Sequence, residues 1–190
     1  AAWLVATSPA FLFMLMWPMR DIPAAFWAAL SVWLVLQAGT VTALFAGAAA
    51  AVGVLTRPNF VLIAGAMFGW LVLLALARQE RTTSARRAAA FLLGVSPAAV
   101  ITVLLNLRWF GRPLASGYGT TSELLHSDRV VTNVSRYGGW LVDTSPLLLV
   151  GVVAILLPLS VLWARPVWRL PMLFASIVAS TLSVYLVYQP

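Results

Sequence analysis

Hydrophobic residues fill most of the chain in long stretches, and short polar breaks separate these stretches. Each stretch runs to about 16–20 residues, close to the roughly 20 residues that a helix needs to cross the hydrocarbon core of a bilayer. The pattern predicts seven membrane-spanning helices, over residues 1–17, 21–37, 41–55, 60–77, 88–107, 147–163 and 170–187. A bend is expected in the fifth helix at Gly94 to Pro97, because proline removes a backbone donor.

The breaks carry residues that start, stop or join helices. Asp21 is expected to cap the second helix, with Pro23 in its first turn. Residues 56–59 (Thr-Arg-Pro-Asn) interrupt the apolar run before the fourth helix. Small residues four positions apart allow two helices to approach closely in lipid, and such sets predict helix packing here. They are Ala43, Gly47 and Ala51 in the third helix, and Gly65 and Gly69 in the fourth.

One long segment, residues 106–145, is dominated by polar residues, glycine and charge. It holds four of the twelve arginines, three of the five acidic residues and the single histidine. Residues 120–123 (Thr-Thr-Ser-Glu) match a capping box, so a short helix is predicted over 121–127. A second short helix is predicted over 133–141, with an apolar face suited to lying on a membrane surface. These features predict one long extracytoplasmic loop over about 108–145 that contains short helices.

Composition supports the same class of protein. The chain is 62% hydrophobic and 9% charged, with a mean hydropathy of +0.96, whereas a soluble domain has about 25% charged residues. The absence of cysteine excludes disulfides, thiolate metal sites and cysteine nucleophiles. We therefore predict an all-α, polytopic transmembrane helix bundle of about seven spans. Residues 1–190 would form a single transmembrane domain, a fragment of a longer chain, because the sequence opens inside an apolar run without an initiator methionine.

The net charge of +7 comes entirely from arginine. In a membrane protein such a charge indicates contacts with lipid headgroups and the orientation of the chain in the membrane, not binding of nucleic acid. Alternation of the seven spans places residues 78–87 and 165–169 on one side, and Arg20, Arg57 and the long loop on the other. By the positive-inside rule the two short basic segments are expected in the cytoplasm. Arginines kept on the outer face then indicate an anionic ligand there.

Three polar clusters are expected to meet this outer face: Arg20 with Asp21, Arg57 with Asn59, and the start of the long loop. The planar fork of donors on arginine suits phosphate oxygens. Two simpler interpretations stay open, because arginines also extend to lipid headgroups and Asp21 can act only as a helix cap. The glycine-rich residues 111–120 lack the preceding strand and the GK[ST] ending of a phosphate-binding loop. No catalytic triad or metal-binding motif is present.

Several short motifs resemble one enzyme family. They are Ser8 to Phe13 followed by Met19 to Ala25, Leu55 to Asn59, and Asn106 to Gly119. These stretches resemble bacterial polytopic glycosyltransferases of the C superfamily, which include protein-mannosyltransferase and aminoarabinose-transferase-like enzymes. The resemblance implies an enzyme of the bacterial inner membrane that takes a polyprenyl-phosphate-linked sugar as donor. It would transfer the sugar to an acceptor on the extracytoplasmic face.

The resemblance also implies roles for particular residues. Asp21 would be a second carboxylate at the site, while the main catalytic base would lie in a loop before Ala1, so that the fragment alone would be inactive. The predicted contacts to the donor and its lipid phosphate are Arg20, Arg57, Asn59, Arg108, Arg112 and Tyr118. No cofactor is identified, a divalent cation stays open, and the acceptor is unknown. The alternatives are a transporter or flippase for a lipid or polysaccharide, and a membrane scaffold without a small-molecule site.

Overall fold

The computed structural model describes residues 21–76, 81–116, 119–120, 126–144 and 169–187, together with Thr7 and Leu12. These residues form six α-helices, two short 3-10 helices and one pair of two-residue strands. The chain divides into two compact units, Ala1–Leu105 and Asn106–Pro190. The helical class predicted from the sequence is therefore confirmed.

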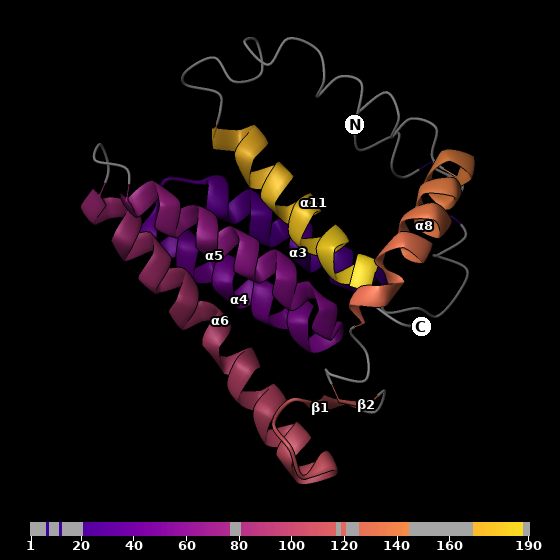
Figure 1. The fold of residues 1–190 in the computed structure, drawn as a ribbon. Coiled ribbons are helices and arrows are strands. Elements are labelled where there is room, and N and C mark those ends of the chain that lie inside the picture. The colour runs from indigo at the N-terminus through magenta and orange to yellow at the C-terminus, as the bar shows by residue number, and fades with distance from the viewer. Residues whose placement is uncertain are drawn as a thin grey trace. The chain divides into compact units, whose positions relative to one another are not determined.

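The first unit is built from helices that pack side by side (Figure 1). They are α3 (Asp21–Leu36), α4 (Thr40–Thr56), α5 (Val61–Leu76) and the first part of α6 (Arg81–Phe110), with the 3-10 helix η1 (Pro58–Phe60) before α5. The starts and ends of α3, α4 and α5 agree with the predicted helices to within a residue or two. This agreement follows from the polar and proline-containing breaks that separate the apolar runs.

The start of α6 corrects the sequence-based prediction. We expected residues 78–87 to form a basic loop and a helix to begin at residue 88, but the helix already begins at Arg81. Arginine and alanine are both strong helix formers, so residues 85–90 continue the helix despite their charge. The helix also runs on to Phe110, into the segment that we had assigned to the long loop.

The proline inside α6 does not end the helix. Pro97 has no N–H, so the carbonyl of Leu93, four residues earlier, loses its usual donor. The hydroxyl of Ser96 donates to this carbonyl at 2.9 Å. In a membrane helix a neighbouring serine can satisfy the backbone group that a proline leaves free.

Small residues form the contact between α4 and α6. Ala43, Gly47 and Ala51 are all buried, as their spacing predicted. A Cβ atom added to Gly47 would lie 3.0 Å from the Cα of Gly94 and would overlap the carbonyl oxygen of Phe91. The two backbones therefore touch at Gly47 and Gly94, where any larger residue would separate the helices.

The second predicted packing motif behaves differently. A Cβ atom added to Gly65 or Gly69 of α5 would meet no atom within 4 Å. The prediction that this pair mediates packing is therefore wrong for the described part of the chain. Spacing alone shows that a helix has a smooth face, but it does not show whether another helix meets that face.

A buried serine joins three helices of the first unit. Ser31 of α3 is fully buried, and its hydroxyl donates to the carbonyl of Ala46 in α4 at 2.7 Å. It also lies 3.5 Å from the sulfur of Met67 in α5. A buried hydroxyl costs stability unless it is hydrogen-bonded, so these contacts fix how the three helices meet.

The arginine at the start of α6 caps a neighbouring helix. Arg87 is buried, and its guanidinium donates to the carbonyls of Val35 and Gln37 at 2.6 and 2.8 Å. These carbonyls belong to the C-terminal end of α3, where positive charge is favoured by the helix dipole. Asp21 begins the same helix. The basic segment and Asp21 therefore lie at opposite ends of α3, as the predicted alternation required.

The second unit contains α8 (Val130–Thr144) and α11 (Arg169–Val187), which pack against each other. The amide of Asn133 donates to the carbonyls of Leu186 and Tyr185 at 2.9 and 3.3 Å. The backbone N–H of His126 donates to the carbonyl of Val187 at 2.7 Å. Three C-terminal carbonyls of α11 are thus satisfied from the segment before and within α8.

The predictions for the second unit were right in part. The helix expected over 170–187 is confirmed as α11, and the one expected over 133–141 is longer, as α8. An unpredicted antiparallel pair, β1 (Ala115–Ser116) with β2 (Gly119–Thr120), follows α6. The 3-10 helix η2 (Ser127–Arg129) stands just before α8. The short helix expected over 121–127 falls mostly outside the described residues.

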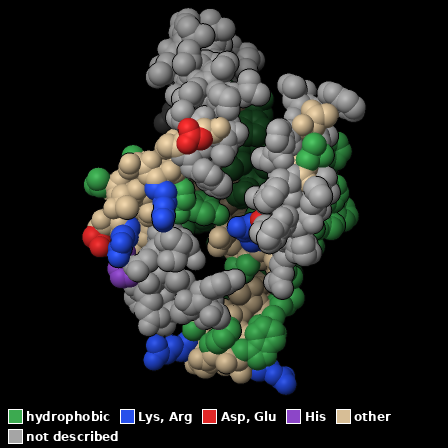
Figure 2. All heavy atoms as spheres, turned by 90° about the vertical axis from the view of Figure 1, so that its right-hand side faces the viewer, with side chains coloured by type: hydrophobic (Ala, Val, Ile, Leu, Met, Phe, Trp, Pro, Cys, Tyr) green, Lys and Arg blue, Asp and Glu red, His purple; other side chains and the backbone are tan. Residues whose placement is uncertain are grey.

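Among the described residues, three helices are long and apolar enough to cross a membrane: Pro58–Leu76, Thr82–Phe110 and Leu170–Val187, of 19, 29 and 18 residues. The apolar helices α3 and α4 have 16 and 17 residues. Many large hydrophobic side chains remain exposed along the helices (Figure 2). The spans predicted over 1–17 and 147–163 lie almost wholly outside the described residues. The chain is thus a helical protein whose described part holds three candidate membrane-spanning helices.

Candidate functional site

An ion pair joins the two residues that the sequence singled out most strongly. The guanidinium of Arg57 contacts the carboxylate of Asp21. Asp21 is the first residue of α3, and Arg57 follows the last residue of α4. Because the two helices run antiparallel, the start of one lies beside the end of the other. The expectation that these residues lie together is therefore met by the structure.

The backbone at Arg57 follows directly from the sequence. A residue before proline is pushed into an extended conformation, and Arg57 has φ −147° and ψ 107°. Its N–H donates to the carbonyl of Gly53 at 2.9 Å, and its own carbonyl accepts the N–H of Phe60 at 3.0 Å. Pro58 opens η1, where its missing N–H costs nothing. The break thus holds Arg57 in one backbone position at the end of α4.

The pair remains accessible. The side chain of Arg57 is 36% exposed and that of Asp21 is 28% exposed. A guanidinium has five N–H donors, so one carboxylate leaves some of them for another ligand. Asn59 is exposed within η1, two residues after Arg57. This end of the helices can therefore offer a cation, a carboxylate and an amide to one polar molecule.

The other predicted site residues are not placed relative to the Asp21–Arg57 pair. Arg20 and Tyr118 lie outside the described residues. Arg108 stands in the last turn of α6 and Arg112 follows that helix, and both side chains are exposed. They belong to the second unit. Their convergence with Asp21 stays a prediction.

The turn that carries Arg112 has a defined shape. The amide of Asn106 donates to the carbonyl of Pro113 at 3.0 Å, which closes the chain back onto α6. Gly111 has a φ of +69°, a conformation that glycine adopts without strain. The strands β1 and β2 then pair directly after it. The glycine-rich segment is thus a structured turn in its described part.

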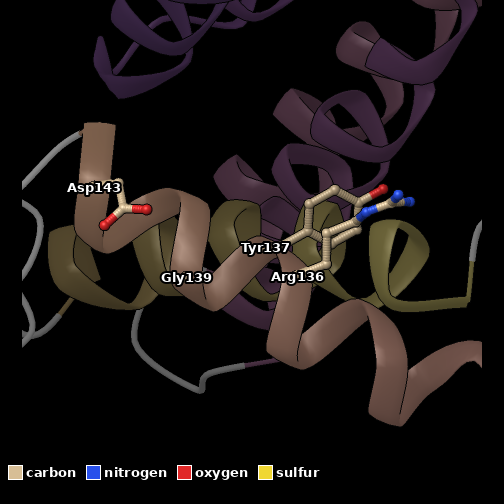
Figure 3. Close-up of a pocket in the computed structure, with 4 residues that line it drawn as sticks. All are labelled: Arg136, Tyr137, Gly139 and Asp143. Atoms are coloured by element: carbon tan, nitrogen blue, oxygen red, sulfur yellow. The ribbon is translucent and has the colours of Figure 1, made fainter.

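The second unit has a pocket that the sequence analysis did not find. Its volume is about 490 Å³, and its described lining consists of Arg136, Tyr137, Gly139 and Asp143 of α8 (Figure 3). We had predicted the helix and its apolar face, but had assigned no role to its polar face. Residues 136, 139 and 143 are spaced by three and four positions, which places them on one side of a helix. This spacing is the feature of the sequence from which the polar face of α8 could have been predicted.

No described residues offer a metal site. Within the described ranges no group of three or more histidine, aspartate or glutamate side chains could hold a metal ion. His126 lies 3.9 Å from the carboxylate of Asp128, which also approaches Arg129 at 3.7 Å. A single carboxylate beside a histidine does not make a metal site of the usual ligand number.

Comparison with known proteins does not identify a family. No protein-family model, no curated protein sequence and no solved structure matches the chain significantly. The resemblance to the C superfamily therefore stays a prediction from short motifs. The chain is identified as a helical protein with three candidate membrane-spanning helices in the part that the structure describes.

Proposed function

We propose that the chain forms about seven membrane spans and is part of a longer integral membrane glycosyltransferase of the bacterial inner membrane. It would transfer a sugar from a polyprenyl-phosphate-linked donor to an acceptor on the extracytoplasmic face. The observation that supports this proposal is the accessible Asp21–Arg57 pair, which stands at helix ends opposite the basic start of α6. A charged pair at such a place is a candidate for a ligand site.

The chemistry of sugar transfer gives each residue a role. The acceptor forms a new bond to the anomeric carbon as the bond between that carbon and the phosphate oxygen breaks, so negative charge grows on the lipid phosphate as it leaves. The guanidinium of Arg57 stabilises that charge, with Asn59 donating a further hydrogen bond. Asp21 orients Arg57 and accepts a hydrogen bond from a hydroxyl group of the bound sugar. The base that activates the acceptor lies in another part of the full-length protein.

The test uses the full-length protein in detergent and measures release of sugar from a polyprenyl-phosphate donor. The variants are Asp21→Asn and Arg57→Ala. Loss of a charge-assisted hydrogen bond costs about 1.5–3 kcal/mol, so turnover should fall roughly 10- to 100-fold in each variant. The exposed Arg86 of α6 supplies the matched control. Its substitution, Arg86→Ala, removes the same charge from the opposite end of the helices and should leave turnover within about twofold of the wild type.

A charge exchange separates catalysis from bracing of the helices. The double variant Asp21→Arg with Arg57→Asp restores an ion pair but moves the cation to α3. Because a reacting group displaced by about 1 Å can lose about 100-fold in rate, turnover should stay low while thermal stability recovers. Recovery of both quantities would mean that the pair only holds the helices together. Unchanged turnover in the single variants, or a folded wild type that releases no sugar, would contradict the proposed function.

A further inference from the structure

One side of α8 packs against the end of α11. Asn133 and Tyr137 are four residues apart and therefore share a side of α8. The amide of Asn133 donates to the carbonyl of Leu186 at 2.9 Å. The ring of Tyr137 meets that of Tyr185 edge to face, with centroids 6.2 Å apart. Both residues reach the last turn of α11, so the start of α8 crosses the end of that helix (Figure 1).

The contact with α11 leaves two other sides of α8 exposed, one polar and one apolar. The polar side consists of three exposed residues, which are spaced by four and seven positions: Thr132, Arg136 and Asp143. The apolar side carries Val131 and Val134, whose side chains are 80% and 52% exposed. These valines lie three positions apart and therefore also share a side. In its described part, α8 thus separates an apolar surface from a polar one.

The depth of α8 gives its apolar side a physical meaning. Exposed single valines are common on the surface of soluble proteins. The candidate span Leu170–Val187 has 18 residues, however, and such a helix rises about 27 Å, close to the roughly 30 Å of a hydrocarbon core. Its last turn therefore stands where the hydrocarbon meets the headgroups. Because α8 is bonded to this turn, its start lies at the same depth, where tyrosines such as Tyr137 and Tyr185 are also favoured.

The charges of this segment indicate which lipids it requires. Between residues 127 and 144 the charged residues are two aspartates and two arginines, whose charges cancel: Asp128, Arg129, Arg136 and Asp143. Helices that bind anionic membranes carry an excess of lysine and arginine on the polar face. This segment has no such excess. Apolar contact, and not attraction to anionic headgroups, is therefore the interaction that can hold α8 on a membrane.

We propose that α8 lies in the interface of the lipid bilayer and anchors the end of α11 there, without a requirement for anionic lipid. Val131 and Val134 face the acyl chains, while the polar side faces water. The sequence predicted an apolar face for this helix, and the structure adds the contact that sets its depth. The inference goes beyond the proposed function, because it requires only that α11 spans the membrane.

The test uses the full-length protein in nanodiscs and spin labels on single introduced cysteines. The chain itself has no cysteine, and any cysteine elsewhere in the full-length protein is replaced first. Electron paramagnetic resonance then measures how often each label collides with oxygen, which concentrates in hydrocarbon, and with a water-soluble nickel chelate. Val131→Cys and Val134→Cys report on the apolar side. Thr132→Cys, at the adjacent exposed position, is the matched control.

A label on α11 calibrates the depth. Val178 is 55% exposed near the middle of α11, so Val178→Cys should show the strongest preference for oxygen. The apolar side of an interfacial helix lies about 5–10 Å into the boundary between headgroups and acyl chains, whereas the centre of the bilayer lies about 15 Å deep. Labels at Val131 and Val134 should therefore prefer oxygen, but less strongly than the label at Val178. The label at Thr132 should prefer the nickel chelate.

The lipid requirement is tested in the same way. The measurements are repeated in nanodiscs of phosphatidylcholine alone and of phosphatidylcholine with phosphatidylglycerol, and the pattern should be the same in both. An oxygen preference at Val131 and Val134 that appears only with phosphatidylglycerol would overturn the proposal.

Three further results would also overturn it. Equal preferences at Val131 and Thr132 would show that α8 does not separate lipid from water. Labels at Val131 and Val134 that are immobile and shielded from both reagents would show that protein covers the apolar side. A label at Val178 that prefers the nickel chelate would remove the span on which the depth depends. The expected pattern in a protein that releases no sugar would keep the interfacial helix and count only against the glycosyltransferase.

Discussion

Replacement of Gly47 by alanine should destabilise the protein, although alanine is the better helix former. Gly47 of α4 lies against the backbone of α6, and the new Cβ atom would lie 3.0 Å from the Cα of Gly94 and overlap the Phe91 carbonyl. Both neighbours are backbone atoms, so the clash can be relieved only if the two helices move apart. Overpacking of this kind costs about 1–3 kcal/mol.

A second glycine isolates this steric cost. Gly65 lies within α5, and a Cβ atom there would meet nothing within 4 Å. Gly65→Ala therefore gains the helix propensity of alanine, about 1 kcal/mol, without a clash. Because Gly47→Ala gains the same propensity, the difference in unfolding free energy between the two variants equals the steric cost, about 1–3 kcal/mol.

Thermal unfolding in one detergent, followed by circular dichroism, measures this difference. Gly65→Ala should unfold at or above the wild-type temperature, and Gly47→Ala should unfold at a lower temperature than Gly65→Ala. If Gly47→Ala were as stable as Gly65→Ala, the close contact between α4 and α6 would be refuted. Equal losses in both variants would instead show that the Gly65 face of α5 is packed against a further element in the full-length protein.

Three further substitutions test the polar contacts between helices. Ser31→Ala should lower the unfolding free energy by about 1 kcal/mol, because the bond to α4 is lost; thermal unfolding measures it. Arg87→Met should cost about 3 kcal/mol, since two charge-assisted bonds to the end of α3 disappear, whereas Arg86→Met, at an exposed neighbour, should cost little. Asn133→Ala should cost about 1–2 kcal/mol and speed hydrogen exchange in the last turn of α11, unlike Thr132→Ala at the adjacent exposed position. An unchanged unfolding free energy in Ser31→Ala, or equal effects in the Arg87 or Asn133 variant and its control, would contradict the corresponding contact.

Local features of the sequence predicted the described helices with useful accuracy. The starts and ends of α3, α4 and α5 follow from the length of the apolar runs and from the breaks at residues 37–40 and 56–59. Pro58 alone dictates the extended backbone of Arg57. These features can be predicted without reference to distant residues, because proline, glycine and the length of a hydrophobic run determine the conformation of the residues next to them.

The misjudged features depended on distant partners. We expected residues 78–87 to be a loop because they are charged, but in α6 Arg87 is buried and bonds the carbonyls that end α3. Gly47 and Gly65 have similar surroundings in the sequence, yet only Gly47 meets another helix. Run length and spacing describe one helix at a time, and they carry no information about what lies beside it.

The candidate sites divide in the same way. The sequence by itself determined that the chain is helical and strongly apolar, and that Asp21 and Arg57 stand at helix breaks. Only the tertiary structure decided that these two charges touch and that a pocket lies along α8. The physical reason is that helix formation follows from the chemistry of nearby residues. Contact between the charges of Asp21 and Arg57 instead depends on how α3 and α4 pack against each other, which neither helix determines alone.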